Sequence, residues 1–210
     1  MSAVNRVVKI FILSDLILWS GWGFIDPLFS VFVVNEIVGA TLVSVGFLAA
    51  IYWVSKGFLQ IPISIFLDKT EGEQDDFYAL ILGLLVIGIS AFSFALSKEI
   101  WQVYLFQFVK SVGFALYIPA WSAILSRHLD KGHTAFEWAL SSSAVSLGIG
   151  FAGVIGGSIA TIAGFNFLFL FTGSMAILSA ATLIFVPDLI LPRKTMAAPT
   201  LSDHVRAGIK

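Results

Sequence analysis

Six long apolar runs divide the chain, and they constrain its fold more than any other feature. They cover residues 7–34, 42–67, 77–96, 100–125, 136–163 and 165–186. A helix needs about 20 mostly apolar residues to cross a bilayer, and every run reaches that length. None has the alternating ten-residue pattern of a membrane β-strand. The sequence therefore predicts an all-α membrane protein, with six transmembrane helices in residues 1–190 and a polar cytoplasmic tail or linker in residues 191–210.

The composition supports this class and excludes others. Of the 210 residues, 58% are hydrophobic and 12% are charged, about half the charged fraction of a soluble domain. A net charge of −1 gives no electrostatic basis for binding nucleic acid. The chain has no cysteine, which excludes disulfides and thiol catalysis. We expect no cofactor and no metal, and the expected partners are the lipid bilayer and a small-molecule substrate.

The positions of Lys and Arg predict which side of the membrane each loop occupies. If the N-terminus is cytoplasmic, the external loops hold only Lys98 of the 12 bases, and two more bases lie within spans. We therefore expect both termini in the cytoplasm and the protein in the plasma (inner) membrane. The acid-rich loop after the second run falls inside as well, because acids contribute little to this rule.

Four ionisable residues lie within the predicted spans: Asp15, Asp26, Lys56 and Lys110. A charged side chain in hydrocarbon costs several kcal/mol unless it faces protein, a partner or water. Their depths along the helices predict the pairs Asp15–Lys56 and Asp26–Lys110 in at least one conformation. Two interpretations stay open, namely static structural ion pairs and a role in handling substrate or protons.

Polar and aromatic residues recur at helical spacing around these charges, on the first, second and fourth runs. Such faces predict a central cavity, which formally would hold two acids and two bases, so the substrate's charge cannot be predicted. The candidate substrate- or proton-binding residues are Asp15, Trp19, Trp22, Asp26, Trp53, Lys56, Gln60, Gln107, Lys110, Tyr117 and Trp121.

The fifth run carries a small residue at every fourth position from 144 to 164, which allows another helix to approach closely. The packing partner is either a helix of the same chain or another subunit. The third and sixth runs carry almost no polar stripe. Each is the last run in a group of three, and this equivalence predicts a three-plus-three inverted repeat. The candidate helix-packing residues are Gly148, Ala152, Gly153, Gly156 and Gly157.

The loop after the second run resembles a motif of the major facilitator superfamily, G-x-x-x-D-R/K-x-G followed by bases. Asp68 and Lys69 match it, Ser64 stands in place of the first Gly, and Gly72 is displaced by one position. Acids replace the later bases. In that family the loop Asp helps to hold one conformation, so the resemblance implies that Asp68 is a conformational latch.

Two other runs resemble the same family in part. The fifth run follows its antiporter pattern G-x-x-x-G-P-x-x-G-G at Gly148, Gly156 and Gly157, with Ala152 and Gly153 in place of Gly-Pro. In the fourth run the family has an Arg four residues before a Gly, whereas here a Lys stands three residues before one.

The resemblance covers residues 8–190 and implies the N-terminal six-helix half of a transporter. It implies secondary-active transport of a small solute by alternating access, with proton coupling as an option. A second six-helix half is then expected, as a homodimer or as a separate chain. The alternative is a non-transporting or truncated membrane subunit of a transporter complex. We expect no enzyme, since the spans contain no paired-Asp protease motif, metal cluster or Ser-His arrangement.

Overall fold

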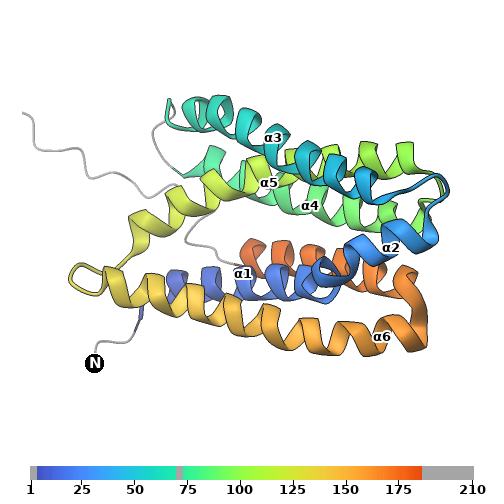
Figure 1. The fold of residues 1–210 in the computed structure, drawn as a ribbon. Coiled ribbons are helices and arrows are strands. Elements are labelled where there is room, and N and C mark those ends of the chain that lie inside the picture. Colours follow the sequence, from blue (N-terminus) through green and yellow to red (C-terminus); the bar gives the residue numbers. More distant parts are fainter. Residues whose placement is uncertain (1–3, 70–72, 186–210) are drawn as a thin grey trace, which may run out of the picture.

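The computed structural model describes residues 4–69 and 73–185, and helices make up nearly all of this part (Figure 1). The predictions for Glu71, Gly72 and the tail at 191–210 lie outside the described residues. The elements are α1 (Arg6–Ile25), the short 3-10 helix η1 (Asp26–Leu28), α2 (Phe29–Glu36), α3 (Leu42–Leu67), α4 (Gln74–Leu96), α5 (Ile100–His128) and α6 (Thr134–Ile184).

Five helical segments in the described ranges are long and apolar enough to cross a membrane, where the sequence predicts six. The difference lies in α6, an element of 51 residues that contains both the fifth and the sixth predicted runs. At about 1.5 Å per residue, a straight helix of that length would be more than twice as long as the bilayer core is thick. However, Gly164 within α6 is non-helical, with φ 79° and ψ 169°, and Figure 1 shows the ribbon doubling back. We refer below to the first arm (134–163) and the second arm (165–184) of α6.

The first predicted run is also interrupted, because α1 ends at Ile25 and α2 begins at Phe29. Pro27 lies in the 3-10 turn between them, and its lack of an N–H donor favours a break in the helical hydrogen bonds. The break leaves Asp26 exposed at the end of α1, where its carboxylate can face a cavity.

Side-chain caps explain where several other helices begin. The Thr41 hydroxyl accepts from the Ser44 amide at 3.3 Å, and the Ser44 hydroxyl accepts from the Thr41 amide at 3.1 Å, which makes a capping box before α3. Glu99 and Gln102 form a second capping box at the start of α5. Each cap satisfies amides that a helix start leaves without a partner.

The helices form two groups (Figure 1). One consists of α1 with both arms of α6, and the other consists of α5 with α3 and α4. The groups also meet where α4 packs against the second arm of α6, at Gly88 beside Ile177 and at Gly173 beside Phe92. Few backbone contacts join α1 to α5, so long side chains bridge the space between these two helices.

The predicted small-residue stripe packs against α1 of the same chain. A Cβ on Gly156 would overlap the carbonyl oxygen of Phe24, and a Cβ on Gly148 would overlap the Ser20 side chain. Ala152 is buried in the same contact. Gly153 makes an ordinary contact, 3.6 Å from Pro27, whereas a Cβ on Gly157 would meet nothing within 4 Å. Gly148 and Gly156 therefore let the first arm of α6 approach α1 closely, whereas the face that carries Gly157 stays open.

The second predicted span, α3, is the least covered of the long helices, with 11% of its most apolar window buried. Large apolar side chains such as Phe47, Phe58 and Phe66 are exposed along it. By contrast α4, which carries no polar stripe, buries Leu80, Leu84 and Ile87 fully, because one of its sides lies against α5 and α6.

Candidate functional site

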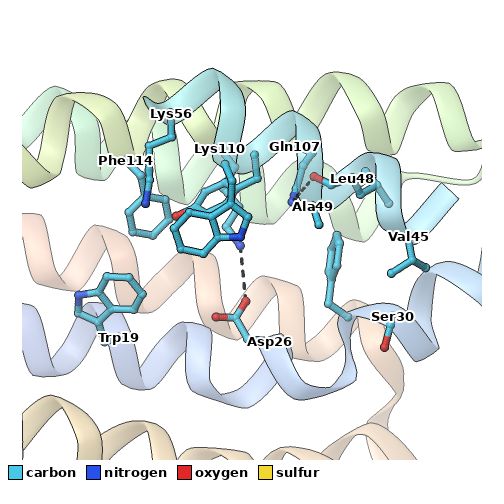
Figure 2. A pocket seen from close by; sticks show the side chains of 13 residues that line it. Trp19, Asp26, Ser30, Val45, Leu48, Ala49, Lys56, Gln107, Lys110 and Phe114 are labelled. Carbon is cyan, nitrogen blue, oxygen red and sulfur yellow. Dashed lines mark hydrogen bonds and ion pairs between the residues drawn. The ribbon is translucent and has the colours of Figure 1, made fainter. Parts of the chain in front are cut away.

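A cavity of about 350 Å³ lies between the two helix groups, bounded by α1, η1 and α2 on one side and by α3 and α5 on the other (Figure 2). Most of its wall is aromatic or aliphatic, with one carboxylate, two ammonium groups, an amide and two hydroxyls among the lining side chains. The lining residues are Trp19, Asp26, Phe29, Ser30, Val45, Leu48, Ala49, Tyr52, Trp53, Lys56, Gln107, Lys110 and Phe114.

An ion pair crosses this cavity from α5 to the end of α1. Lys110 Nζ donates to Asp26 Oδ1 at 3.5 Å (Figure 2), which confirms the pair predicted from helix depth. The two partners differ in environment, since the Lys110 side chain is 9% exposed and the Asp26 side chain 49%. Lys110 is therefore enclosed by protein, whereas the Asp26 carboxylate faces open space.

Aromatic rings surround the Lys110 ammonium on its other sides. Nζ lies 3.4 Å from the ring centroid of Trp22 and 5.2 Å from that of Tyr52. The ring centroids of Phe29 and Phe114 lie farther away, at 5.9 and 6.0 Å from Nζ, which is about the limit of cation–π attraction. These ring faces stabilise a cation but are weak hydrogen-bond acceptors, so Asp26 is the main hydrogen-bond acceptor for the buried Lys110 ammonium.

Lys56, on α3, also rests on aromatic rings. Its Nζ lies 4.0 Å from the Trp53 centroid and 5.2 Å from the Tyr52 centroid. In the part of the chain that the structure describes, Lys56 forms no ion pair. The predicted Asp15–Lys56 pair is therefore not formed in this structure. Depth along the helices was a poor guide here, because the rotation of α3 aims the ammonium at the cavity.

Asp15 instead accepts a hydrogen bond from the Tyr117 hydroxyl at 2.6 Å. It is 6% exposed and does not line the cavity. This contact joins α1 to α5. The cavity therefore holds one acid and two bases, not the balanced set expected from sequence.

The remaining predicted residues divide into lining and supporting positions. Gln107 lines the cavity, and its Nε2 donates to the Leu48 carbonyl oxygen at 3.3 Å, while its Oε1 is buried without a partner. Trp22 is buried beneath Lys110. Trp121 packs on Trp138 with ring centroids 5.8 Å apart, and neither Trp121 nor Gln60 lines the cavity.

Sequence reasoning missed several lining residues, above all Tyr52, which both lysines approach. Its signal was present in the sequence, because Val45, Leu48, Tyr52 and Lys56 follow one another at spacings of three and four on a single helix face. Phe29, Ser30 and Ala49 were also missed. Apolar side chains at such spacing are common on any packed helix, so only the tertiary structure singles them out.

The acids after α3 pair mainly with bases at the end of α5. Asp76, 1% exposed in its side chain, forms an ion pair with Arg127. Glu73 Oε1 lies 3.5 Å from Nδ1 of His128, a nitrogen that is also 3.0 Å from the Ile124 carbonyl oxygen. Two of the acids that replace the bases of the loop motif, Glu73 and Asp76, thus tie the start of α4 to α5 within this chain.

The loop-motif residues themselves are exposed. Asp68 ends α3, and its amide donates to the Ser64 carbonyl oxygen at 2.9 Å. Lys69 follows with its amide 3.3 Å from the Phe66 carbonyl oxygen. Across the described ranges, no group of His, Cys, Asp and Glu side chains is arranged to hold a metal ion.

Comparisons with known proteins agree with this architecture. The sequence profile of the Major Facilitator Superfamily matches residues 11–205. A curated relative, an uncharacterized MFS-type transporter of Methanocaldococcus jannaschii, is 22% identical over 160 residues. That alignment covers 76% of this chain and 40% of the relative, so the chain spans less than half of the relative's length. The chain is an integral, multi-pass membrane protein, and it belongs to the Major Facilitator Superfamily.

Proposed function

We propose that the chain forms one half of a secondary-active transporter that moves a small solute across the membrane by alternating access. The observation that carries this proposal is the cavity with Asp26, Lys56 and Lys110 in its wall. These charges lie in helices of membrane-spanning composition, where each is costly unless it faces a water-filled or ligand-filled space. A cavity of about 350 Å³ falls within the size range of small-molecule sites.

The helix arrangement supports six crossings in a three-plus-three inverted repeat, with the two arms of α6 as the fifth and sixth crossings. If α1 corresponds to α5, then α3 corresponds to the first arm of α6 and α4 to the second arm. In each set the first helix packs against the second and third helices of the other set: α1 against both arms of α6, and α5 against α3 and α4. The contact of α4 with the second arm of α6 would lie on the two-fold axis of such a repeat.

A second six-helix half would cover the open side of this structure. The cavity opens along α3, where Trp53 is 63% exposed, and α3 is little covered elsewhere. In this proposal the second half is a further copy or a separate segment or chain. Both termini are cytoplasmic, and Asp68 acts as the latch on that side against the second half. Since Lys110 is held and Asp26 faces the cavity, Asp26 is the better candidate for carrying a proton.

A second candidate function is a non-transporting membrane subunit. The pairing of Asp76 with Arg127 and of Glu73 with His128 favours it. These contacts hold charges inside one half, whereas a gating loop needs charges that can engage the other half.

Thiol accessibility distinguishes the two functions, and the cysteine-free chain suits it. Ser30→Cys would place a thiol in the cavity wall. The matched control is Ser174→Cys, an exposed position on the second arm of α6 outside the cavity. A charged, membrane-impermeant maleimide is added to right-side-out and to inside-out vesicles containing the full chain.

Alternating access requires that Ser30→Cys is labelled in both vesicle types, because the cavity opens to each side in turn. Ser174→Cys faces lipid and should be labelled in neither. Labelling of Ser30→Cys from one side alone would contradict transport and favour the non-transporting subunit. Equal labelling of the two variants would contradict the cavity itself.

A further inference from the structure

We infer that the solute is an organic anion with a flat apolar body, whose carboxylate replaces Asp26 as the counter-ion of Lys110. This inference rests on the proposed transport function and identifies the class of substrate for the same cavity. It depends on the charge balance of the cavity wall, on the shortage of hydrogen-bond acceptors around each lysine, and on the aromatic rings beside the two lysines.

The charge balance of the wall is positive. Lys56 and Lys110 face the cavity with a single acid, Asp26, among the lining residues. Asp15, which would have neutralised the set, is turned away and bonded to Tyr117. One negative charge brought by a solute would restore neutrality in a space where unbalanced charge is costly.

Both ammonium groups have fewer hydrogen-bond acceptors around them than they have N–H donors. Each has three N–H donors, yet Lys110 has one carboxylate oxygen at 3.5 Å, the far limit of an ion-pair hydrogen bond. Within the described residues, Lys56 contacts rings only, without a hydrogen bond or ion pair from its Nζ. A carboxylate has two oxygens and accepts about four hydrogen bonds, so it supplies what these donors lack.

The two lysines are placed to act on one solute. Each ammonium lies 5.2 Å from the centroid of the same ring, that of Tyr52. Figure 2 shows both entering from the α3 and α5 side, with Asp26 pointing toward them from η1 at the end of α1. A carboxylate near Tyr52 would therefore lie within electrostatic range of both ammonium groups.

The rest of the wall suits an apolar body. Trp19 and Phe114 lie with ring centroids 5.3 Å apart, and Phe29, Tyr52 and Trp53 complete an aromatic lining. A volume of about 350 Å³ corresponds to on the order of a dozen water-sized units, which matches a solute with roughly as many non-hydrogen atoms. A free inorganic anion would leave these rings unused.

Asp26 is the competitor in this arrangement. Its side chain is 49% exposed and makes one long contact, so it can leave Lys110 without being buried alone. Removing its charge should therefore strengthen anion binding. A site built around Asp26 as the ligand of a cationic solute would respond in the opposite way.

Three probes of one shape test the inference: phenylacetate, 2-phenylacetamide and 2-phenylethylammonium. Binding to the full chain in lipid nanodiscs is measured by quenching of tryptophan fluorescence and by calorimetry. We expect phenylacetate to bind about tenfold more tightly than the amide, as one charge-assisted contact provides, and the ammonium to bind most weakly.

Variants assign the preference to the residues. Lys56→Met and Lys110→Met should each remove most of the preference for the anion, and Lys110→Arg should keep it. Asp26→Asn should tighten phenylacetate binding about three- to tenfold. Lys98→Met changes the same residue type at an exposed position outside the cavity and should leave all three affinities unchanged.

Equal binding of anion and amide, tighter binding of the ammonium, absence of binding by all three probes, or weaker phenylacetate binding in Asp26→Asn would each overturn the inference. Because binding is read without transport, these outcomes are separate from the accessibility test. If the cavity opens to both sides but binds the ammonium most tightly, the proposed transport function is retained and the inference of an anionic solute is refuted.

Discussion

Gly156 makes the closest approach between α1 and the first arm of α6, and its replacement by Ala gives a sharp test of the fold. A Cβ at this position would overlap the Phe24 carbonyl oxygen and approach the Phe24 carbonyl carbon and Cα at 3.0 Å. These are backbone atoms of a helix, so they cannot rotate away as a side chain would. Overpacking of this kind costs about 1–3 kcal/mol.

The next residue provides the matched control. A Cβ on Gly157 would meet nothing within 4 Å, and Ala is favoured over Gly in a helix interior by about 1 kcal/mol. Gly157→Ala should therefore be neutral or slightly stabilising. The propensity gain is common to both variants, so their free energies of unfolding should differ by the overpacking cost alone, about 1–3 kcal/mol, which corresponds to a difference in Tm of about 2–12 °C.

The assay is thermal unfolding of the full chain in mild detergent, followed by tryptophan fluorescence and by the loss of the monodisperse peak in size-exclusion chromatography. The two variants share helix, residue type and chemical change, so detergent effects cancel in the comparison. Equal stabilities would refute the reasoning. A larger loss for Gly157→Ala would mean that the stripe packs through its other face, against a different chain.

Two further substitutions test contacts that bridge or shape the helices. Tyr117→Phe removes the hydroxyl that donates to buried Asp15 at 2.6 Å and should destabilise the chain by about 1.5–3 kcal/mol in the same unfolding assay. Tyr104→Phe, on the same helix but without a side-chain hydrogen bond in the described part, should change little, and equal effects would contradict a structural role for the Asp15 contact. Gly164→Ala should destabilise by about 1–3 kcal/mol, because φ of 79° and ψ of 169° suit Gly alone. Gly150→Ala, at a helical position with open space around it, is its control, and a tolerated Gly164→Ala would argue against the reversal of α6.

Much of the architecture could be predicted because it follows from local composition. Apolar runs of sufficient length form helices in a membrane, since no water is present to satisfy free backbone groups. The predicted runs coincide with the observed helices to within a few residues, apart from the short break at Asp26–Leu28. The predicted boundary between the fifth and sixth runs lies beside Gly164, where the backbone leaves the helical conformation and the chain turns back.

The site was predicted in part. The Asp26–Lys110 pair followed from depth, because both residues lie at similar heights in neighbouring helices. The Asp15–Lys56 pair did not form, because height leaves the rotation of each helix about its axis undetermined. A small rotation decides whether a side chain meets a carboxylate, a ring or open space, and Lys56 meets rings.

The sequence by itself determined the class of protein, the approximate ends of its helices and the presence of charges that need a cavity. Only the tertiary structure decided that Tyr117 holds Asp15 away from that cavity, that Tyr52 lies beside both lysines, and that Asp76 pairs with Arg127. The physical reason is that hydrophobicity acts through composition along the chain. Ion pairs and ring contacts, by contrast, depend on distances of a few ångströms between residues far apart in sequence, and packing alone sets those distances.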